Sequence, residues 1–382
     1  MADETRIKEN LKLLSFPRLS GTENEKKALN IVKKKIEDLN LKSFIQRFSF
    51  STFYSRIYPK IAFSLIFLLF SILVLNIQEK FIDISFIIIS LILISLFIFT
   101  RKPEKIKLGY NLNSQNLFVK FSNENVNKDI LLFSHLDSKK QRLPVNIRIF
   151  SFKLWLFSFL GGTIIILLRL FIINHLFFWF YLIGVIILAI NGLATLLIII
   201  NTSHNKSPGA IDNASGVSCV LEILNHFSKP GMRLKNYNLW FVFTGAEECG
   251  TMGIRHFYNE NMKHLDKNRS YVINFDSIGV GDLSYWSIYI NPKKNYDLYK
   301  VFLKKAEILD LKFEFHDRAF GFRSDGLYLR SKGFHGFGFG GSGLLYKYVH
   351  TINDTVDKVD TSLLEKLSKY VPIILKEIDN RY

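Results

Sequence analysis

The amino-acid sequence predicts an α/β domain, with a sheet covered by helices, and four transmembrane helices inserted into it as two hairpins. Two observations lead to this fold class. Short β-rich runs alternate along the chain with amphipathic helical runs, which is typical of a sheet covered by helices. Hydrophobic residues make up 48% of the 382-residue chain and gather in four long runs, which indicates membrane spans.

The expected strands are short, and turn residues bound each of them. They are residues 129–135, 237–244, 270–276 and 286–290. The expected helices are residues 24–40, residues 217–227, and a terminal helix over 360–378 that begins with Asp360 as its N-cap. This order of strands and helices predicts an α/β sheet.

Four apolar runs approach the roughly 20 residues that cross a bilayer as a helix. They are residues 61–77, 81–99, 154–173 and 177–200. The alternative is a buried helix in a soluble core. Such a helix carries a polar face, and these four runs have almost none. We therefore predict a multi-pass integral membrane protein.

The links within each pair of apolar runs, "QEK" and "NH", are so short that each pair is a hairpin whose outer ends emerge on the same side. Basic residues flank these outer ends and are scarce at the tips, a bias that marks the cytoplasmic side. The flanking residues are Arg47, Arg56, Lys60, Arg101, Lys102, Lys105, Lys107, Lys139, Lys140, Arg142, Arg148 and Lys153. No apolar secretory signal precedes the first hairpin, so we expect the catalytic domain on the cytoplasmic side.

The hairpins divide the predicted soluble domain into three pieces. Residues 1–57, 103–150 and 201–382 are expected to form one discontinuous domain, with residues 58–100 and 151–200 as the two hairpins. Together the three pieces are long enough to bury one large core.

Charge and cysteine content exclude other classes of protein. The net charge is +17, but no basic stripe with interleaved aromatic residues appears, so we expect no nucleic-acid partner. Much of the excess charge lies beside the apolar runs, where anionic lipid headgroups explain it. Cys219 and Cys249 are too few for a disulfide framework and suit a reducing compartment as packing residues.

Residue types that bind metals occur at five places, several of them where an expected strand ends. These residues are His135 and Asp137 in "LLFSHLDS", Asp212 in "GAIDNASG", Glu247 and Glu248 in "FVFTGAEECG", Asp276 in "VINFDSIG", and His350 in "YKYVHTINDT". The carboxyl ends of strands in an open α/β sheet line one crevice, so these side chains can converge. Imidazoles and carboxylates without thiolates favour a catalytic zinc site or one for a similar divalent ion.

The spacing of these residues suggests separate roles. Two neighbouring cations need a bridging carboxylate, and Asp212 in its glycine-rich loop is our candidate. Of the adjacent pair Glu247 and Glu248, one can bind metal while the other acts as general base. Asp137, two residues after His135, can reach the second imidazole nitrogen and fix its tautomer.

The ordered set "HLDS", "GAIDNASG", "TGAEECGTMG", "NFDSIG" and "VHTINDTVDKVD", preceded by "FPRLSGTENEKKAL", resembles the co-catalytic di-zinc aminopeptidases of metallopeptidase family 28. The resemblance spans nearly all of the expected soluble domain and leaves the hairpins outside. It implies a mixed, twisted sheet between helices. It also implies that His135 and Asp276 hold one zinc, Glu248 and His350 hold the other, Asp212 bridges them, Glu247 is the base and Asp137 orients His135.

The activity that the resemblance implies is hydrolysis of a peptide bond next to a free N-terminus, with a peptide substrate and two zinc ions per chain. Water between the zincs attacks the carbonyl, and Glu247 moves its proton to the leaving amine. Two alternatives stay open. One is a glutaminyl-cyclase-like acyl transferase, which works with one zinc on the same fold. The other is a non-catalytic membrane scaffold or binding protein.

One segment departs from the family pattern. The family commonly has Ser-Asp-His and then Gly-Ile-Pro near its specificity pocket, whereas this chain reads "RSDGLYLRSKGFHGFG". Gly326 and His335 stand at the altered places, and no expected metal ligand is lost. The departure therefore concerns substrate preference. The expected partners are a peptide and the lipid bilayer, and the oligomeric state is left open.

Overall fold

The computed structural model describes residues 2–75, 79–169, 176–281, 283–287, 301–302, 304–307, 311, 313–316, 323–341 and 343–381. The chain divides into two compact units. Unit 1 consists of Met1–Phe50, Leu112–Lys140 and His204–Tyr382, and unit 2 consists of Ser51–Asn111 and Gln141–Ser203. The chain therefore leaves unit 1 twice and returns twice. The domain boundaries expected from sequence stay a prediction.

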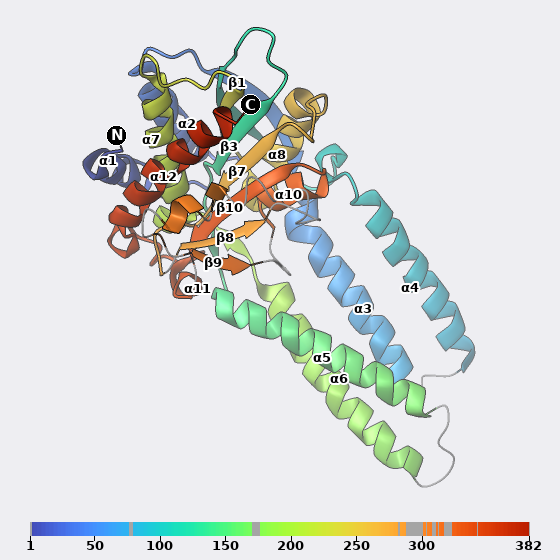
Figure 1. The fold of residues 1–382 in the computed structure, drawn as a ribbon. Helices are drawn as coiled ribbons and strands as arrows, with labels where there is room; N and C mark the ends of the chain where they lie inside the picture. The colour runs from blue at the N-terminus through green and yellow to red at the C-terminus, as the bar shows by residue number, and fades with distance from the viewer. Residues whose placement is uncertain are drawn as a thin grey trace. The chain divides into compact units, whose positions relative to one another are not determined.

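Unit 1 is built on a mixed eight-stranded sheet with the order β1-β2-β6-β3-β7-β10-β8-β9 (Figure 1). The strands are β1 (Phe44–Ser51), β2 (Asn111–Phe121), β3 (Asp129–His135), β6 (Asn238–Thr244), β7 (Tyr271–Phe275), β8 (Leu283–Ser287), β9 (Phe313–His316) and β10 (His335–Gly341). The predicted α/β fold with a mixed sheet is confirmed. Three predicted strands coincide with β3, β6 and β7. The fourth overlaps β8, and its residues 288–290 lie outside the described residues.

The four central strands β6, β3, β7 and β10 run parallel to one another. Their register places His135 at the end of β3 opposite Thr244 at the end of β6. On the other side of β3, Phe133 pairs with Asn274 of β7. The carboxyl ends of three neighbouring strands therefore meet at one edge of the sheet, where an α/β fold binds its ligand.

Helices cover both faces of this sheet. Helices α1 (Glu4–Leu14), α2 (Glu23–Glu37), α7 (Ser215–Ser228) and α12 (Thr361–Asp379) pack together, and α7 lies against β3, β6 and β7. Helices α8 (Met252–Phe257) and α10 (Asp325–Ser331) pack with each other, and α10 also contacts β3 and β7. The predicted helices correspond to α2, α7 and α12, and the Asp360 side chain caps α12 by accepting the N–H of Ser362.

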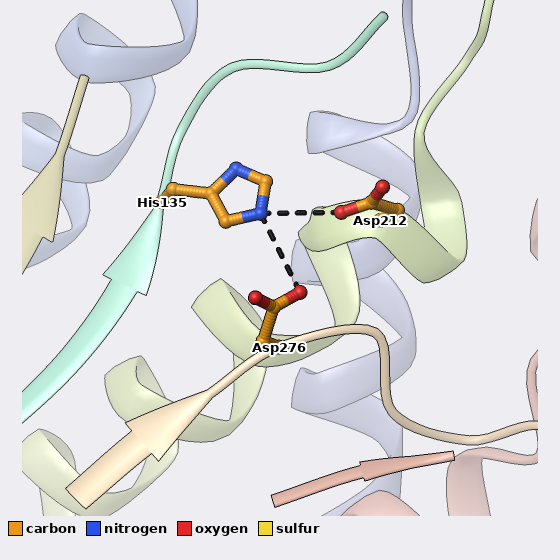
Figure 2. A group of neighbouring side chains, drawn as sticks. All are labelled: His135, Asp212 and Asp276. Carbon is orange, nitrogen blue, oxygen red and sulfur yellow. Dashed lines mark ion pairs between the residues drawn. The ribbon is translucent and has the colours of Figure 1, made fainter. Parts of the chain in front are cut away.

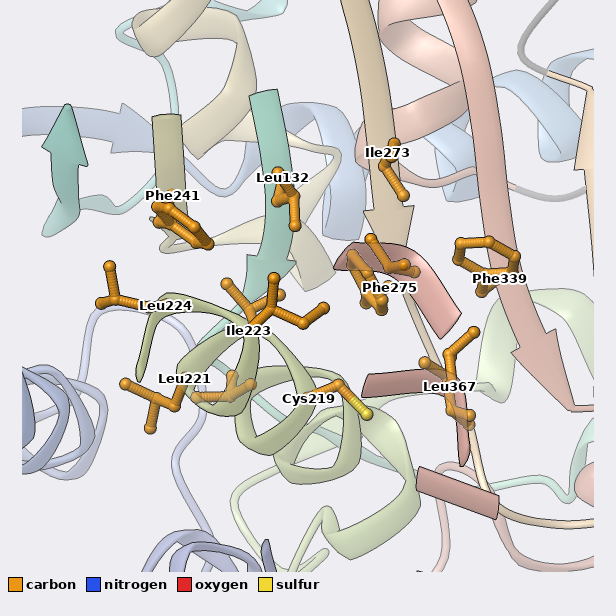
Figure 3. Close-up of a cluster of buried hydrophobic side chains, with 14 of the residues drawn as sticks. Leu132, Cys219, Leu221, Ile223, Leu224, Phe241, Ile273, Phe275, Phe339 and Leu367 are labelled. Carbon is orange, nitrogen blue, oxygen red and sulfur yellow. The ribbon is translucent and has the colours of Figure 1, made fainter. Parts of the chain in front are cut away.

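Successive side chains of a β-strand point to opposite faces of the sheet, so alternate residues of the central strands belong to two separate cores. Leu132 of β3 packs with Phe241, Phe275 and residues of α7, including Cys219 (Figure 3). Its neighbours Leu131 and Phe133 belong to the core on the opposite face. Because both faces are buried, all seven residues of β3 are buried. The strand that carries His135 is thus held from both sides.

Unit 2 consists mainly of four long apolar helices, α3 (Tyr58–Leu75), α4 (Glu79–Phe99), α5 (Val145–Arg169) and α6 (Leu176–Ile200). Among the described residues, three helical segments are long and apolar enough to cross a membrane: Phe53–Leu75, Val145–Arg169 and Phe178–Ile200. The apolar part of α4, Ile84–Phe99, is shorter. The count of four spans stays a prediction. Both hairpin tips fall at least partly outside the described residues.

Helices α3, α5 and α6 pack against one another through small and polar residues, as membrane helices do. The fully buried Asn191 of α6 donates to the hydroxyl of Ser158 on α5 at 2.9 Å. At Gly162 of α5, an added Cβ would lie 2.1 Å from the ring of Phe70 on α3. Glycine is therefore required where these two helices approach. Shorter elements include β4 (Lys140–Gln141), β5 (Ser203–His204) and α11 (Leu345–Tyr348).

Candidate metal centre

All seven residues singled out from sequence lie in unit 1 and converge at one edge of its sheet. His135 is the last residue of β3, and Asp276 directly follows β7. Glu247 and Glu248 open a short helical turn three residues after β6. The other three come from loops: Asp137 lies two residues after the end of β3, Asp212 lies in the turn Ala210–Ala214 ahead of α7, and His350 follows α11.

Three of these side chains form a first group (Figure 2). The Nε2 atom of His135 lies 3.1 Å from Oδ1 of Asp212 and 3.6 Å from Oδ1 of Asp276. One ligand atom from each residue lies within 4.8 Å of the others, so the group could hold a metal ion. We call it group 1.

A second group of the same kind shares Asp212. Nε2 of His350 lies 3.0 Å from Oδ2 of Asp212 and 3.2 Å from Oε1 of Glu248. These atoms also lie within 4.8 Å of one another, and we call them group 2. Asp212 therefore offers one carboxylate oxygen to each group. This is the geometry that a bridging ligand between two cations requires.

The carboxylates and imidazoles of the two groups shift one another's pKa values. Burial alone would lower the pKa of His135, but the bonds to Asp137, Asp212 and Asp276 hold that pKa well above its ordinary value. Burial would raise the pKa of Asp212, and the imidazoles of His135 and His350 instead hold it well below its ordinary value. The centre is therefore rich in buried negative charge.

The residues of the two groups fit zinc. Oε1 of Glu248 is buried and has no hydrogen-bond partner among the described residues, although it points at His350. A buried carboxylate oxygen left in this way is costly unless a cation binds it. Two imidazoles with carboxylates and no thiolate are the donors of catalytic zinc sites.

Glu247 contributes no atom to either group, although it is adjacent to Glu248. Its side chain is buried, and burial holds the pKa of Glu247 well above its ordinary value. Burial would raise the pKa of Glu248 as well, but Lys139 and His350 lower it to about 2. The two adjacent glutamates thus differ: burial favours the protonated form of Glu247, whereas Lys139 and His350 favour the carboxylate of Glu248.

Asp137 connects two of the converging segments. Its Oδ1 accepts the backbone N–H of Glu247 at 3.1 Å, and its Oδ2 accepts that of Glu248 at 3.0 Å. Its Oδ1 lies 3.4 Å from Nδ1 of His135, and its backbone carbonyl lies closer to that nitrogen, at 3.1 Å. Asp137 can therefore orient both the imidazole and the two glutamates.

Arg18 is a buried residue of the centre that sequence reasoning did not single out. It is 1% exposed, and its guanidinium donates to backbone carbonyls only. It binds the carbonyl of Leu136 at 2.6 Å, between His135 and Asp137. It also binds the carbonyls of Pro208 at 2.6 Å and Gly209 at 2.8 Å, just ahead of Asp212. One side chain thus holds two ligand-bearing segments together.

Two further buried carboxylates hold loops of the centre and were also missed. Asp354 accepts the backbone N–H groups of Ile211 at 2.5 Å and of Asp212 at 3.3 Å. Glu25 accepts the N–H of Ala246 at 2.8 Å, next to Glu247. Both lie in the stretches "TENE" and "INDT" that belong to the resemblance, but their partners are 142 to 221 residues away in the chain.

Backbone conformation supports a functional site at these loops. Ala246 and His350 have φ of 51° and 63°, a left-handed region that residues with a Cβ rarely adopt. Such residues cluster at active sites, where the surrounding structure holds them in place. Each lies at or beside a proposed ligand or base.

The segment that departs from the family pattern lies close to the centre. Gly326 is buried in α10, and His335 begins β10. Asp325, beside Gly326, accepts the hydroxyl of Thr244 at 2.5 Å, and burial raises its pKa to about 7. Asp325 is a further titratable residue that interacts with the charges of His135 and Asp276, and its sequence pattern alone indicated no role.

Comparison with known proteins supports the resemblance to a peptidase family. The model of peptidase family M28 matches residues 195–372, a little under half of the chain. The matched region contains Asp212, Glu247, Glu248, Asp276 and His350. His135 and Asp137 precede it in the chain, before α5 and α6. The resemblance stated from sequence is confirmed.

Solved structures of two aminopeptidases and a glutaminyl cyclase share the fold. An aminopeptidase from Aneurinibacillus sp. strain AM-1 is 16% identical, with a TM-score of 0.56 over 98% of this chain and 93% of that chain. A zinc aminopeptidase from Bacillus subtilis is 14% identical, with a TM-score of 0.57 over 99% and 95%. A glutaminyl cyclase from Fimbriiglobus ruber has a TM-score of 0.56 at 14% identity, over 98% and 95%.

One relative is named for a membrane. The "Vacuolar membrane protease" of Vanderwaltozyma polyspora is 28% identical over 199 residues, which are 47% of this chain. The matched part spans 19% of that relative's length. The relative is therefore much longer than the part that this chain resembles.

Proposed function

We propose that this protein is a membrane-anchored, zinc-dependent aminopeptidase that removes residues from the N-terminus of peptides. The observation that carries the proposal is that group 1 and group 2 share Asp212. The match to the model of a peptidase family and the fold of zinc aminopeptidases support it. When bound, two zinc ions would polarise the scissile carbonyl and lower the pKa of the attacking water.

The protein's own residues then have distinct roles. His135 and Asp276 would hold one zinc, Glu248 and His350 the other, and Asp212 both. Glu247 takes a proton from the attacking water and returns it to the leaving amine, which its position outside both groups and its raised pKa support. Asp137 orients Glu247 by accepting the backbone N–H of Glu247, and it orients His135 by its contact with Nδ1 of the imidazole.

The test uses the full-length protein in detergent, supplied with zinc and a library of peptides with free or acetylated N-termini. We expect shortening of free peptides only, and a loss of about 10²–10⁴-fold in kcat in Glu247→Gln, because that variant cannot accept the proton. Glu23→Gln is the matched control, since that side chain is 90% exposed on α2. If wild type and Glu247→Gln behave alike, the protein is not this enzyme and a non-catalytic scaffold is the better description.

A glutaminyl-cyclase-like activity is separated by product and metal content. Such an enzyme would release ammonia from peptides with N-terminal glutamine without shortening them, and would hold one zinc per chain. Two zinc ions per chain by elemental analysis, together with release of free amino acids, would support the aminopeptidase. The fold alone does not separate the two, because solved structures of both classes match it equally well.

We also propose that unit 2 anchors the protein in a bilayer as a multi-pass domain, with unit 1 on the cytoplasmic side. The three long apolar helices and the basic residues that flank them support this. Protease digestion of sealed vesicles of known sidedness tests it. Unit 1 should be cleaved from the cytoplasmic face without detergent, and its protection until detergent is added would place it on the opposite side.

A further inference from the structure

Lys139 places a half-buried cation directly against group 2. Its Nζ lies 2.5 Å from Oε2 of Glu248, and the two side chains are 15% and 4% exposed. The other oxygen of the same carboxylate, Oε1, is the one that faces His350. Glu248 therefore has one oxygen engaged by an ammonium and one directed into the group.

The backbone holds Lys139 in this position. Its neighbour Ser138 is 1% exposed, donates its hydroxyl to the carbonyl of Ser207 at 3.1 Å, and donates its N–H to the carbonyl of Arg18 at 3.1 Å. Glu248 is held in turn by the bond from its N–H to Asp137. The ion pair thus joins the segment of Ser138 and Lys139 to that of Glu248. The backbone of the first is bound to Arg18, and the backbone of the second is bound to Asp137.

Among the described residues, group 1 has no equivalent lysine or arginine. His135 pairs with Asp212 and Asp276, Asp212 also pairs with His350, and no lysine or arginine of the described residues forms an ion pair with either carboxylate. Arg18 is buried nearby, but its bonds go to backbone carbonyls. The two groups are therefore similar in ligands and different in charge.

We infer that Lys139 makes the two metal positions unequal, so that a divalent cation binds group 1 more tightly than group 2. The inference rests on the proposed metal centre. An ammonium withdraws charge from Glu248 and repels a dication bound to the same carboxylate, and this repulsion is strong where water is excluded. Loss of a neutral or anionic partner of a metal ligand ordinarily weakens metal binding by about 10–100-fold. Because Lys139 carries the same sign of charge as the metal, its loss should change the affinity in the opposite direction.

The experiment is a titration of the metal-free, full-length protein with zinc by calorimetry, and with cobalt(II) followed by its visible absorption. Wild type should show two binding steps. In Lys139→Met, which removes the charge, we expect the weaker step to tighten by about tenfold or more while the tighter step is unchanged. Lys139→Gln, which keeps a hydrogen-bond donor but no charge, should behave like Lys139→Met. Lys140→Met is the matched control and should match wild type.

A second measurement assigns the step to its group. In an Asp276→Asn background, which removes a group 1 ligand, the site that is left should again bind more tightly when Lys139 is replaced. An unchanged or weaker second step in both Lys139 variants would overturn the inference, since Lys139 would then only orient Glu248 or play no part. Failure of wild type to bind either metal would instead overturn the proposed function, so the two failures can be told apart.

Discussion

The buried carboxylate of Asp354 accepts the backbone N–H of Asp212 at 3.3 Å, and Asp354 lies only four residues after His350. The loop that carries the shared ligand is thus bound to the loop that carries a terminal ligand of group 2. Asp354 is 0% exposed, so its two oxygens have few alternative partners. The position of Asp212 relative to His350 therefore depends on the bond between Asp354 and Asp212.

Replacing Asp354 by asparagine should therefore weaken metal binding. The amide presents an NH₂ where a backbone N–H needs an acceptor, which leaves one N–H unpaired at a cost of about 1–3 kcal/mol. We expect a loss of about 10–100-fold in zinc affinity, measured by competition with a chelating dye. Asp357→Asn, in the same loop but exposed, should bind zinc as wild type does. Equal losses in both variants would contradict the role given to Asp354.

Arg18 should contribute strongly to stability. Arg18→Lys keeps the charge but cannot reach carbonyls as far apart as those of Leu136 and Gly209, so buried acceptors are left unpaired. We expect a loss of about 3 kcal/mol or more in the free energy of unfolding. Arg269→Lys, on an exposed pair with Asp266 whose side chains are 56% and 42% exposed, should cost less than about 1 kcal/mol. Denaturant titration followed by tryptophan fluorescence compares them, and similar midpoints would refute the prediction.

Glu25 should make the stability of the metal-free protein depend on pH. Burial, with the charge of Asp137, raises the pKa of Glu25 from 4.5 to about 8. The folded state therefore holds a proton that the unfolded state has lost, so this contribution is fully present below pH 4.5 and is lost as the pH rises to about 8. Glu25→Gln cannot titrate and should lose less stability than wild type between these two pH values.

The measurement is the melting temperature of metal-free wild type, Glu25→Gln and the exposed control Glu23→Gln at both ends of this window. Glu23→Gln should follow wild type. If the melting temperature of Glu25→Gln changed with pH as much as that of wild type, other groups would be responsible for the pH dependence.

Two adjacent glycines in α5 should respond differently to the same substitution. A Cβ at Gly162 would lie 2.1 Å from the ring of Phe70, whereas at Gly161 the nearest atom outside the helix, in Ile187, is 3.8 Å away. Gly162→Ala should lose about 1–3 kcal/mol through overpacking, and Gly161→Ala should be neutral or slightly stabilising. Thermal unfolding in detergent compares them. Equal melting temperatures would mean that α3 and α5 separate without cost.

The parts of the fold that follow from local pattern could be predicted from sequence. The apolar residues at the centre of β3 and the helical spacing of apolar residues in α7 are visible in each segment by itself. The ligand residues could be proposed as well, because strand ends in an α/β sheet converge. His135, which ends β3, and Asp276, which follows β7, are such cases.

The residues that support the centre could not be predicted, because their partners are backbone atoms far away in the chain. Glu25 shows the difficulty. It stands three residues after Thr22, the N-cap of α2, as a glutamate does in a capping box. In the fold it instead accepts the N–H groups of Gly21 and Ala246. Lys139 is similar, since the sequence suggested a basic residue at a membrane boundary and the fold places it against Glu248.

The contacts of Arg18 have a consequence for the apolar segment that is inserted between them. The carbonyls of Leu136 and Pro208 meet at one guanidinium, and the chain between them contains all of α5 and α6. The entropy lost in closing a loop grows only with the logarithm of its length, about 0.6 kcal/mol for each doubling. With both ends held by Arg18, the intervening segment can lengthen, shorten or be exchanged with little effect on the ligands. Variants of this segment with different lengths would then suit bilayers of different thickness while the rest of the protein stays the same.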